Sequence, residues 1–158
     1  MSNQNFIGLD AEKAENLTKL LNNLLADYSV FYQNARGYHW NIKGKKFFEL
    51  HIKFEELYNN LFEKIDEVAE RILTLGFTPE HTYSKYFEQA EIQESGRVTD
   101  GFKAVQEVLD SYKILLKKER DILKVAEETA DEGTTALMSD YIREQEKLVW
   151  MNSSYLQK

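Results

Sequence analysis

The 158-residue sequence predicts an all-α fold: a four-helix bundle with a short extra helix in the connection between the second and third helices. Three observations predict it. Apolar residues recur at steps of three and four over four long stretches, which is the period of an amphipathic helix. One proline and seven glycines leave few helix breakers. No linker or low-complexity segment divides the chain, so we expect one domain over residues 1–158, with a short N-terminal tail of about ten residues.

The first two helices are marked by their apolar stripes and by the breakers that follow them. The first stripe runs over residues 11–38, and Gly44 marks the break behind it. The second stripe runs over residues 46–75, where Gly76 and Pro79 end it. We therefore expect two long helices joined by a short loop.

The second half of the chain repeats this arrangement after a longer connection. Residues 83–87 form a short segment that fits a small helix within a crossover. Thr99 is a plausible N-cap of the third helix, with Asp100 behind it. A break is expected over residues 131–135, and the last helix follows over residues 137–152. The long connection permits an up-down-down-up bundle.

Composition limits the classes of function. The chain has no cysteine, which excludes disulfides and thiolate metal sites. No apolar run approaches the roughly 18 residues of a membrane span, and the polar N-terminus lacks the features of a signal peptide, so we expect a cytoplasmic protein. A net charge of −7 opposes direct binding to DNA phosphates and suits attraction of cations.

Two histidines and two carboxylates form a candidate metal-binding set. His39 and His51 lie near the ends of adjacent predicted helices, and Asp66 and Glu70 share one helix face because they are four residues apart. Two imidazoles and two carboxylates suit a first-row metal such as iron. Taken singly, each residue is a weak signal, because an isolated histidine is more often a structural or surface residue and an acidic pair four residues apart is usually a solvated helix face.

The spacing along the second helix separates the two halves of this set. His51 and Asp66 are fifteen residues apart, which at 1.5 Å per residue is about 22 Å, and Glu70 is about 28 Å away. Either the histidines and carboxylates are unrelated, or one site joins two chains related by a two-fold axis. The Glu-x-x-His motif of intrachain di-iron sites does not occur in the sequence.

The same residues carry a resemblance to a known family. The motifs are His39-Trp40-Asn41, Phe48-x-x-His51-x-x-Phe54, Asp66-x-x-Ala69-Glu70-Arg71 and Leu75-Gly76. Together they resemble the signature of the Dps-type mini-ferritins, and the spacing of His39, His51, Asp66 and Glu70 is similar to that family's ferroxidase spacing. The likeness extends through the middle segment and into the last helix.

The resemblance implies a ferritin-like bundle that assembles into a hollow homo-oligomer, a dodecamer, which oxidises iron(II) and stores the ferric mineral. Hydrogen peroxide would be the favoured oxidant, with oxygen as the other. His39 and His51 would come from one subunit and Asp66 and Glu70 from its two-fold mate, forming a di-iron site at that interface. Glu55 would be a further acidic group near the iron.

Other residues have two open interpretations each. Trp40 could give an electron to a strong oxidant or pack in the dimer interface. The family's three-fold channels would here be lined from Asp131, Glu132 and Asp140, although Asp131 also fits a helix cap. Cavity-facing carboxylates that could nucleate mineral, or simply be solvated, are Glu55, Glu56 and Glu63. His81 fits a structural or surface residue.

Three functions are compatible with these features of the sequence. The first is the iron-oxidising storage enzyme. The second is a non-enzymatic, DNA-associated or structural shell protein, with nucleoid association in the cell. The third is a plain helical interaction module. The first twelve residues contain no Lys or Arg, unlike the basic tails of DNA-binding relatives, so we expect no strong direct DNA binding.

Overall fold

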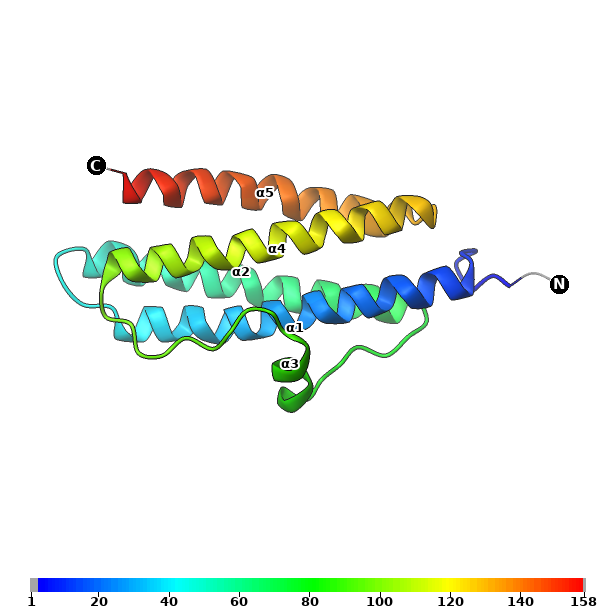
Figure 1. The fold of residues 1–158 in the computed structure, drawn as a ribbon, viewed down its shortest axis with the longest axis horizontal. Coiled ribbons are helices and arrows are strands. Elements are labelled where there is room, and N and C mark those ends of the chain that lie inside the picture. The colour runs from blue at the N-terminus through cyan, green and yellow to red at the C-terminus, as the bar shows by residue number, and fades with distance from the viewer. Residues whose placement is uncertain (1–2, 158) are drawn as a thin grey trace.

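Five helices make up the computed structural model, which describes residues 3–157, and no β-strand lies in that range (Figure 1). They are α1 (Ala11–Asn41), α2 (Phe47–Thr74), α3 (Tyr83–Gln89), α4 (Gly101–Glu128) and α5 (Glu132–Leu156). α2 returns antiparallel to α1, α4 runs in the same direction as α2, and α5 returns (Figure 1). The predicted all-α bundle with an extra helix, in its up-down-down-up form, is confirmed.

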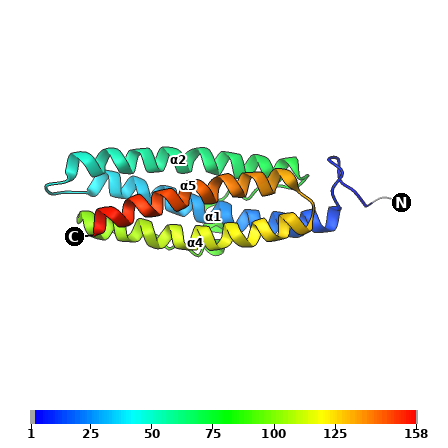
Figure 2. The ribbon, with the colours of Figure 1, turned by 90° about the horizontal axis from the view of Figure 1, so that it is seen from above.

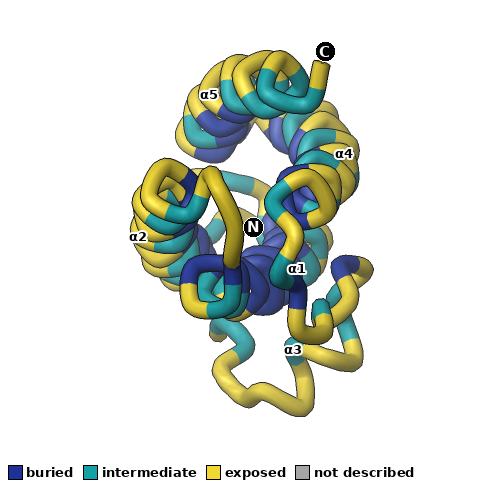
Figure 3. The backbone as a smooth tube through the Cα atoms, turned by 90° about the vertical axis from the view of Figure 1, so that its left-hand side faces the viewer, coloured by how far each residue is buried: buried dark blue, intermediate teal, exposed yellow. Residues whose placement is uncertain are grey.

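The four long helices surround one apolar core (Figures 2 and 3). Each turns its apolar stripe inward, because that stripe recurs with the helical period. α1 lies deepest and is also covered by α3 on its outer side (Figure 3). Within residues 3–157, no helix is long and apolar enough to cross a membrane.

Aspartates begin three of the long helices. Asp10 and Asp100 each accept a hydrogen bond from the backbone N–H three residues on, at 2.9 Å. The prediction that Thr99 is the N-cap of this helix is wrong by one residue, because Asp100 caps α4. The Thr99 carbonyl instead accepts from the Lys43 N–H at 2.9 Å, which ties the α1–α2 loop to the start of α4.

The break before the last helix is shorter and earlier than expected. Asp131 is the N-cap of α5 and accepts from the Thr134 N–H at 3.0 Å, so the first turn of α5 occupies the residues expected to break it. The chain reverses at Ala130, whose φ of 60° is left-handed. Gly133 lies under the guanidinium group of Arg71, where a Cβ would be only 2.6 Å from Nη1.

Side chains of α1 hold the crossover against the bundle. Asn22, Asp27 and Asn34 accept hydrogen bonds from its backbone N–H groups over 2.7–2.9 Å. The donors are Glu80, Glu91, Ile92 and Ser95. Asp27 is fully buried and also pairs with Lys118 of α4. The crossover is thus fixed along the length of α1.

Candidate metal centre

The imidazoles of His39 and His51 form a stacked pair where α1 ends and α2 begins. Their ring centroids are 3.7 Å apart and their planes differ by 12°. His39 Nδ1 lies 2.6 Å from the His51 carbonyl oxygen, and His51 Nδ1 lies 2.8 Å from the His39 carbonyl oxygen. A carbonyl only accepts, so each Nδ1 carries a hydrogen, and in the neutral ring each Nε2 then keeps a free lone pair. This hydrogen bonding fixes the tautomer that binds metals through Nε2.

The loop after α1 leaves the His39 carbonyl available. In a continuing helix the Lys43 N–H would bond back to it, but here that N–H bonds to Thr99. The carbonyl therefore accepts from His51 without losing a helical partner. The hydrogen bond from His51 Nδ1 to the His39 carbonyl therefore both satisfies the end of α1 and orients the His51 imidazole.

Neighbouring side chains hold the two rings and add one carboxylate. Phe47 stacks on His51 at 4.9 Å, and Tyr58 meets His39 edge-on at 5.4 Å. Glu55 Oε2 lies 3.8 Å from His39 Nε2. The Glu55 side chain is half exposed, so the Nε2 edge of His39 faces the outside of the bundle.

Asp66 and Glu70 lie far from this pair. Both are exposed on α2, and within residues 3–157 neither side chain makes a hydrogen bond or ion pair. α2 is unbroken from Phe47 to Thr74, so about 22 Å of helix separates His51 from Asp66. Over the same residues, no three His, Asp or Glu side chains gather in a metal-binding arrangement. One chain holds the imidazole half and the acidic half at separate places.

Two further residues named from the sequence lie at the surface. Trp40 is 58% exposed, and Arg36 lies over its ring at 4.8 Å. A tryptophan this exposed, next to His39, suits contact with another molecule. His81 is exposed in the crossover.

Comparison with known proteins places the chain in a family. A ferritin-like domain model matches residues 18–158. A DNA protection during starvation protein of Porphyromonas gingivalis is 46% identical over 151 residues, which cover 96% of this chain and 95% of the relative. The chain belongs to the Dps-type mini-ferritins.

Solved structures agree with this family. A Dps protein from Vibrio cholerae, described as a member of the ferritin-like diiron-carboxylate proteins, matches with a TM-score of 0.97 and 58% identity. That match covers 99% of this chain and 98% of the other. A Dps protein from Bacillus brevis matches with a TM-score of 0.90 and 33% identity, over 92% and 98% of the two chains.

One expectation about channel lining is wrong in this Dps-type chain. Asp131 is 2% exposed, caps α5 and pairs with Arg71 at 2.6 Å, so it cannot line a channel. The alternative of a helix cap is confirmed. Glu132 and Asp140 are exposed and stay candidates, as do the possible nucleating carboxylates Glu55, Glu56 and Glu63.

A buried polar cluster inside the bundle is the feature that the sequence analysis missed. Tyr28 donates a hydrogen bond to Glu119 Oε2, and Gln145 Nε2 donates to the Tyr28 hydroxyl at 2.7 Å. Burial raises the pKa of Glu119 to about 7, although the hydrogen bonds from its two neighbours oppose the rise. A signal existed: Glu119 falls between Leu115 and Ile122 on the apolar stripe of α4.

Proposed function

We propose that this Dps-type chain oxidises iron(II), with hydrogen peroxide as the favoured oxidant, and stores the ferric product in a hollow shell of twelve copies. Such a shell would remove iron and peroxide together and limit oxidative damage in the cytoplasm. The observation that carries the proposal is the His39–His51 pair, in which both Nε2 atoms are free and preoriented. The kinship with ferritin-like diiron-carboxylate proteins supports the choice of iron.

The iron site would be completed by a second copy of the chain. The length of α2 keeps Asp66 and Glu70 from reaching their own histidines. In a two-fold dimer, an antiparallel α2 brings the acidic end of one helix to the histidine end of the other, and symmetry gives two equal sites. Glu55, beside His39, would add a carboxylate from the histidine-bearing chain.

Each ligand type has its own part in the chemistry. Neutral imidazoles hold iron(II) without adding charge, and the hard anionic oxygens of Asp66 and Glu70 favour iron(III), which promotes oxidation. Two irons at one interface would deliver two electrons to one peroxide: two Fe²⁺, H₂O₂ and two H⁺ give two Fe³⁺ and two H₂O. This two-electron reaction releases no hydroxyl radical. Trp40 keeps two proposed roles, because its exposed ring could either donate an electron to a strong oxidant or pack in the dimer interface.

Peroxide-driven iron oxidation, followed by ferric absorbance, tests the proposal. His39→Ala/Asp66→Ala should slow the initial rate by at least about tenfold, because it removes a ligand from each half of the site. His81→Ala is the matched control, since it removes the third histidine from an exposed position. An unchanged rate in the double variant would reject the site.

Direct DNA binding is not part of the proposal, despite the names of some relatives. The chain carries a net charge of −7, and binding to phosphates depends on Lys and Arg neutralising them. We expect no retention of linear DNA in a gel shift at physiological salt. Tight retention of DNA that resists added salt would favour the alternative function, a shell protein that associates with the nucleoid.

A further inference from the structure

The outer face of α2 carries exposed apolar side chains at both of its ends. Phe48, in the first turn of α2, is 78% exposed, and Leu73, in the last turn, is 58% exposed. Steps of three, four and seven residues link both of them, through Phe62, to the proposed iron ligands of this helix. All of these residues therefore lie along one side of α2, and a row of large exposed apolar residues is typical of a surface that another molecule covers.

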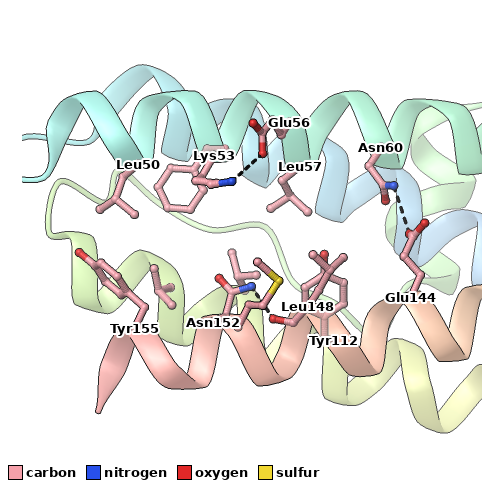
Figure 4. A pocket seen from close by; sticks show the side chains of 14 residues that line it. Leu50, Lys53, Glu56, Leu57, Asn60, Tyr112, Glu144, Leu148, Asn152 and Tyr155 are labelled. Carbon is pink, nitrogen blue, oxygen red and sulfur yellow. Dashed lines mark hydrogen bonds and ion pairs between the residues drawn. The ribbon is translucent and has the colours of Figure 1, made fainter. Parts of the chain in front are cut away.

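The opposite face of α2 already has its partners in the same chain. Leu50, Leu57 and Asn60 point toward α4 and α5, across a groove of about 530 Å³ (Figure 4). Asn60 also donates a hydrogen bond to Glu144 of α5 at 3.1 Å. The outer face is turned away from this groove, so the described part of the chain leaves its apolar residues uncovered.

The proposed iron ligands fix the register in which two copies of α2 would pair. Across a two-fold axis, antiparallel helices bring together residues that are equally far from a common midpoint. His51 and Glu70 are equally far from the middle of α2, and so are Glu55 and Asp66. Both pairs join the histidine end of one helix to the acidic end of the other, so they agree on a single register.

The same register brings Phe48 to Leu73 of the partner subunit. These two residues are also equally far from the middle of α2, whereas about 37 Å of helix separates them within one chain. Symmetry would give the contact twice, once at each end of the paired helices. The Phe48 ring meets Phe47 edge-on at 5.3 Å, and Phe47 stacks on His51, so the contact would close the outer end of each shared site.

The loop before Phe48 is basic and would meet a negative helix end. Lys43, Lys45 and Lys46 are all exposed in this loop. In the same register, the loop falls near the C-terminal end of the partner's α2, where the last carbonyl groups carry a partial negative charge and Glu70 adds a full one. Charge complementarity therefore favours a second copy of this chain as the molecule that covers the face.

We propose that Phe48 and the α1–α2 loop of one chain bind the C-terminal end of α2 in a second copy, with Phe48 packed on Leu73 of the partner subunit. The contact rests on the proposed two-fold site, whose ligands set its register. It removes two exposed apolar side chains from water at each end of the pair, which stabilises the pairing.

Chemical cross-linking tests the contact in iron-free protein, because the chain has no cysteine of its own. Assembled Phe48→Cys/Leu73→Cys is treated with bismaleimidoethane, whose short arm cannot span the roughly 37 Å between the two cysteines of one chain. Denaturing gels should show most chains as linked dimers and no longer ladder. Two-fold pairing predicts this result because it joins both cysteines of a chain to the same partner.

Phe48→Cys/Thr74→Cys is the matched control for this experiment. Thr74 is exposed but is turned by about 100° from Leu73 around the helix, so this variant should link at least about fivefold more slowly. If the first double variant does not assemble, shells mixed from Phe48→Cys chains and Leu73→Cys chains take its place. Chains that stay unlinked, form ladders, or link as fast through Thr74 would overturn the proposal.

The part of the basic loop is tested in the same cysteine variant at low salt. Adding Lys45→Gln/Lys46→Gln should slow the linking at least about twofold, because the attraction to the helix end is lost. Lys117→Gln removes an exposed lysine from α4 and should leave the rate unchanged. Equal rates in all three would overturn the role of the loop.

Iron oxidation by the same shells, measured separately, distinguishes this contact from the proposed function. Unlinked chains that still oxidise iron would reject the contact alone. Linked dimers that do not oxidise iron before or after linking would reject the proposed function and leave the contact in place.

Discussion

At the scale of single residues, His39 and His51 show how a proposed pair of metal ligands is oriented by the chain alone. Each ring is held by the other residue's backbone carbonyl, so neither Nε2 depends on a bound ion for its direction. The sequence identified both residues through their spacing. It could not reveal the reciprocal hydrogen bonds, because these depend on where the Lys43 N–H bonds in the folded loop.

Glu119 should make folding stability depend on pH. Its pKa rises from 4.5 to about 7 on folding, because burial disfavours the charged form. Below pH 4.5 both states are protonated. Between pH 4.5 and 7 the unfolded chain loses the proton first, so stability falls as pH rises, by on the order of 3 kcal/mol. Above about pH 7 this contribution is constant.

Glu119→Gln isolates this effect, because the amide has the same shape and does not ionise. The difference in melting temperature between wild type and Glu119→Gln, followed by circular dichroism, should change over pH 4.5 to 7 in favour of the variant. A difference that is independent of pH would show that Glu119 ionises in the fold as it does in water.

At the scale of elements, the sequence predicted the helices well and their junctions less well. The apolar stripes are repeated over many turns, so four long helices and the small one in the crossover were all found. Junctions depend on single side chains. Gly133 looked like a breaker, but it lies inside α5, because Asp131 caps the helix and Arg71 needs the space above the glycine.

The Asp131–Arg71 contact should stabilise the junction between α4 and α5. Asp131→Ala removes a cap and leaves Arg71 without its buried carboxylate, which should cost about 3 kcal/mol. Asp140→Ala is the control, since its ion pair with Arg143 is exposed and worth less than about 1 kcal/mol. Melting temperatures of the two variants measure the difference. Equal, small losses would mean that the buried contact contributes little.

At the scale of the whole molecule, one exposed face of α2 connects the two halves of the proposed site. His51, Glu55, Phe62, Asp66 and Glu70 follow one another at steps of four or seven, so they lie along one side of the helix. A two-fold axis that pairs the histidine end with the acidic end would pass near the middle of this face. The sequence predicted His51, Glu55, Asp66 and Glu70 as site residues, but it predicted no role for Phe62 and could not show the second chain.

Phe62 lies near that midpoint and is 60% exposed. Phe62→Glu should place two like charges close together at the axis and weaken pairing, because like charges repel and the apolar contact is lost. Size-exclusion chromatography should show smaller species, and iron oxidation should fall with them. Phe62→Leu keeps the surface apolar and should keep the assembly. An intact, active Phe62→Glu shell would place the interface elsewhere.

Complementation between two inactive chains tests most directly whether iron is shared by two subunits. One chain carries His39→Ala/His51→Ala, the other Asp66→Ala/Glu70→Ala, and the two are coexpressed and purified as mixed shells. Random pairing makes about half of the dimers mixed, each with one complete site of two, so about a quarter of wild-type iron oxidation should return. Mixed shells as inactive as either parent would contradict a site shared by two subunits.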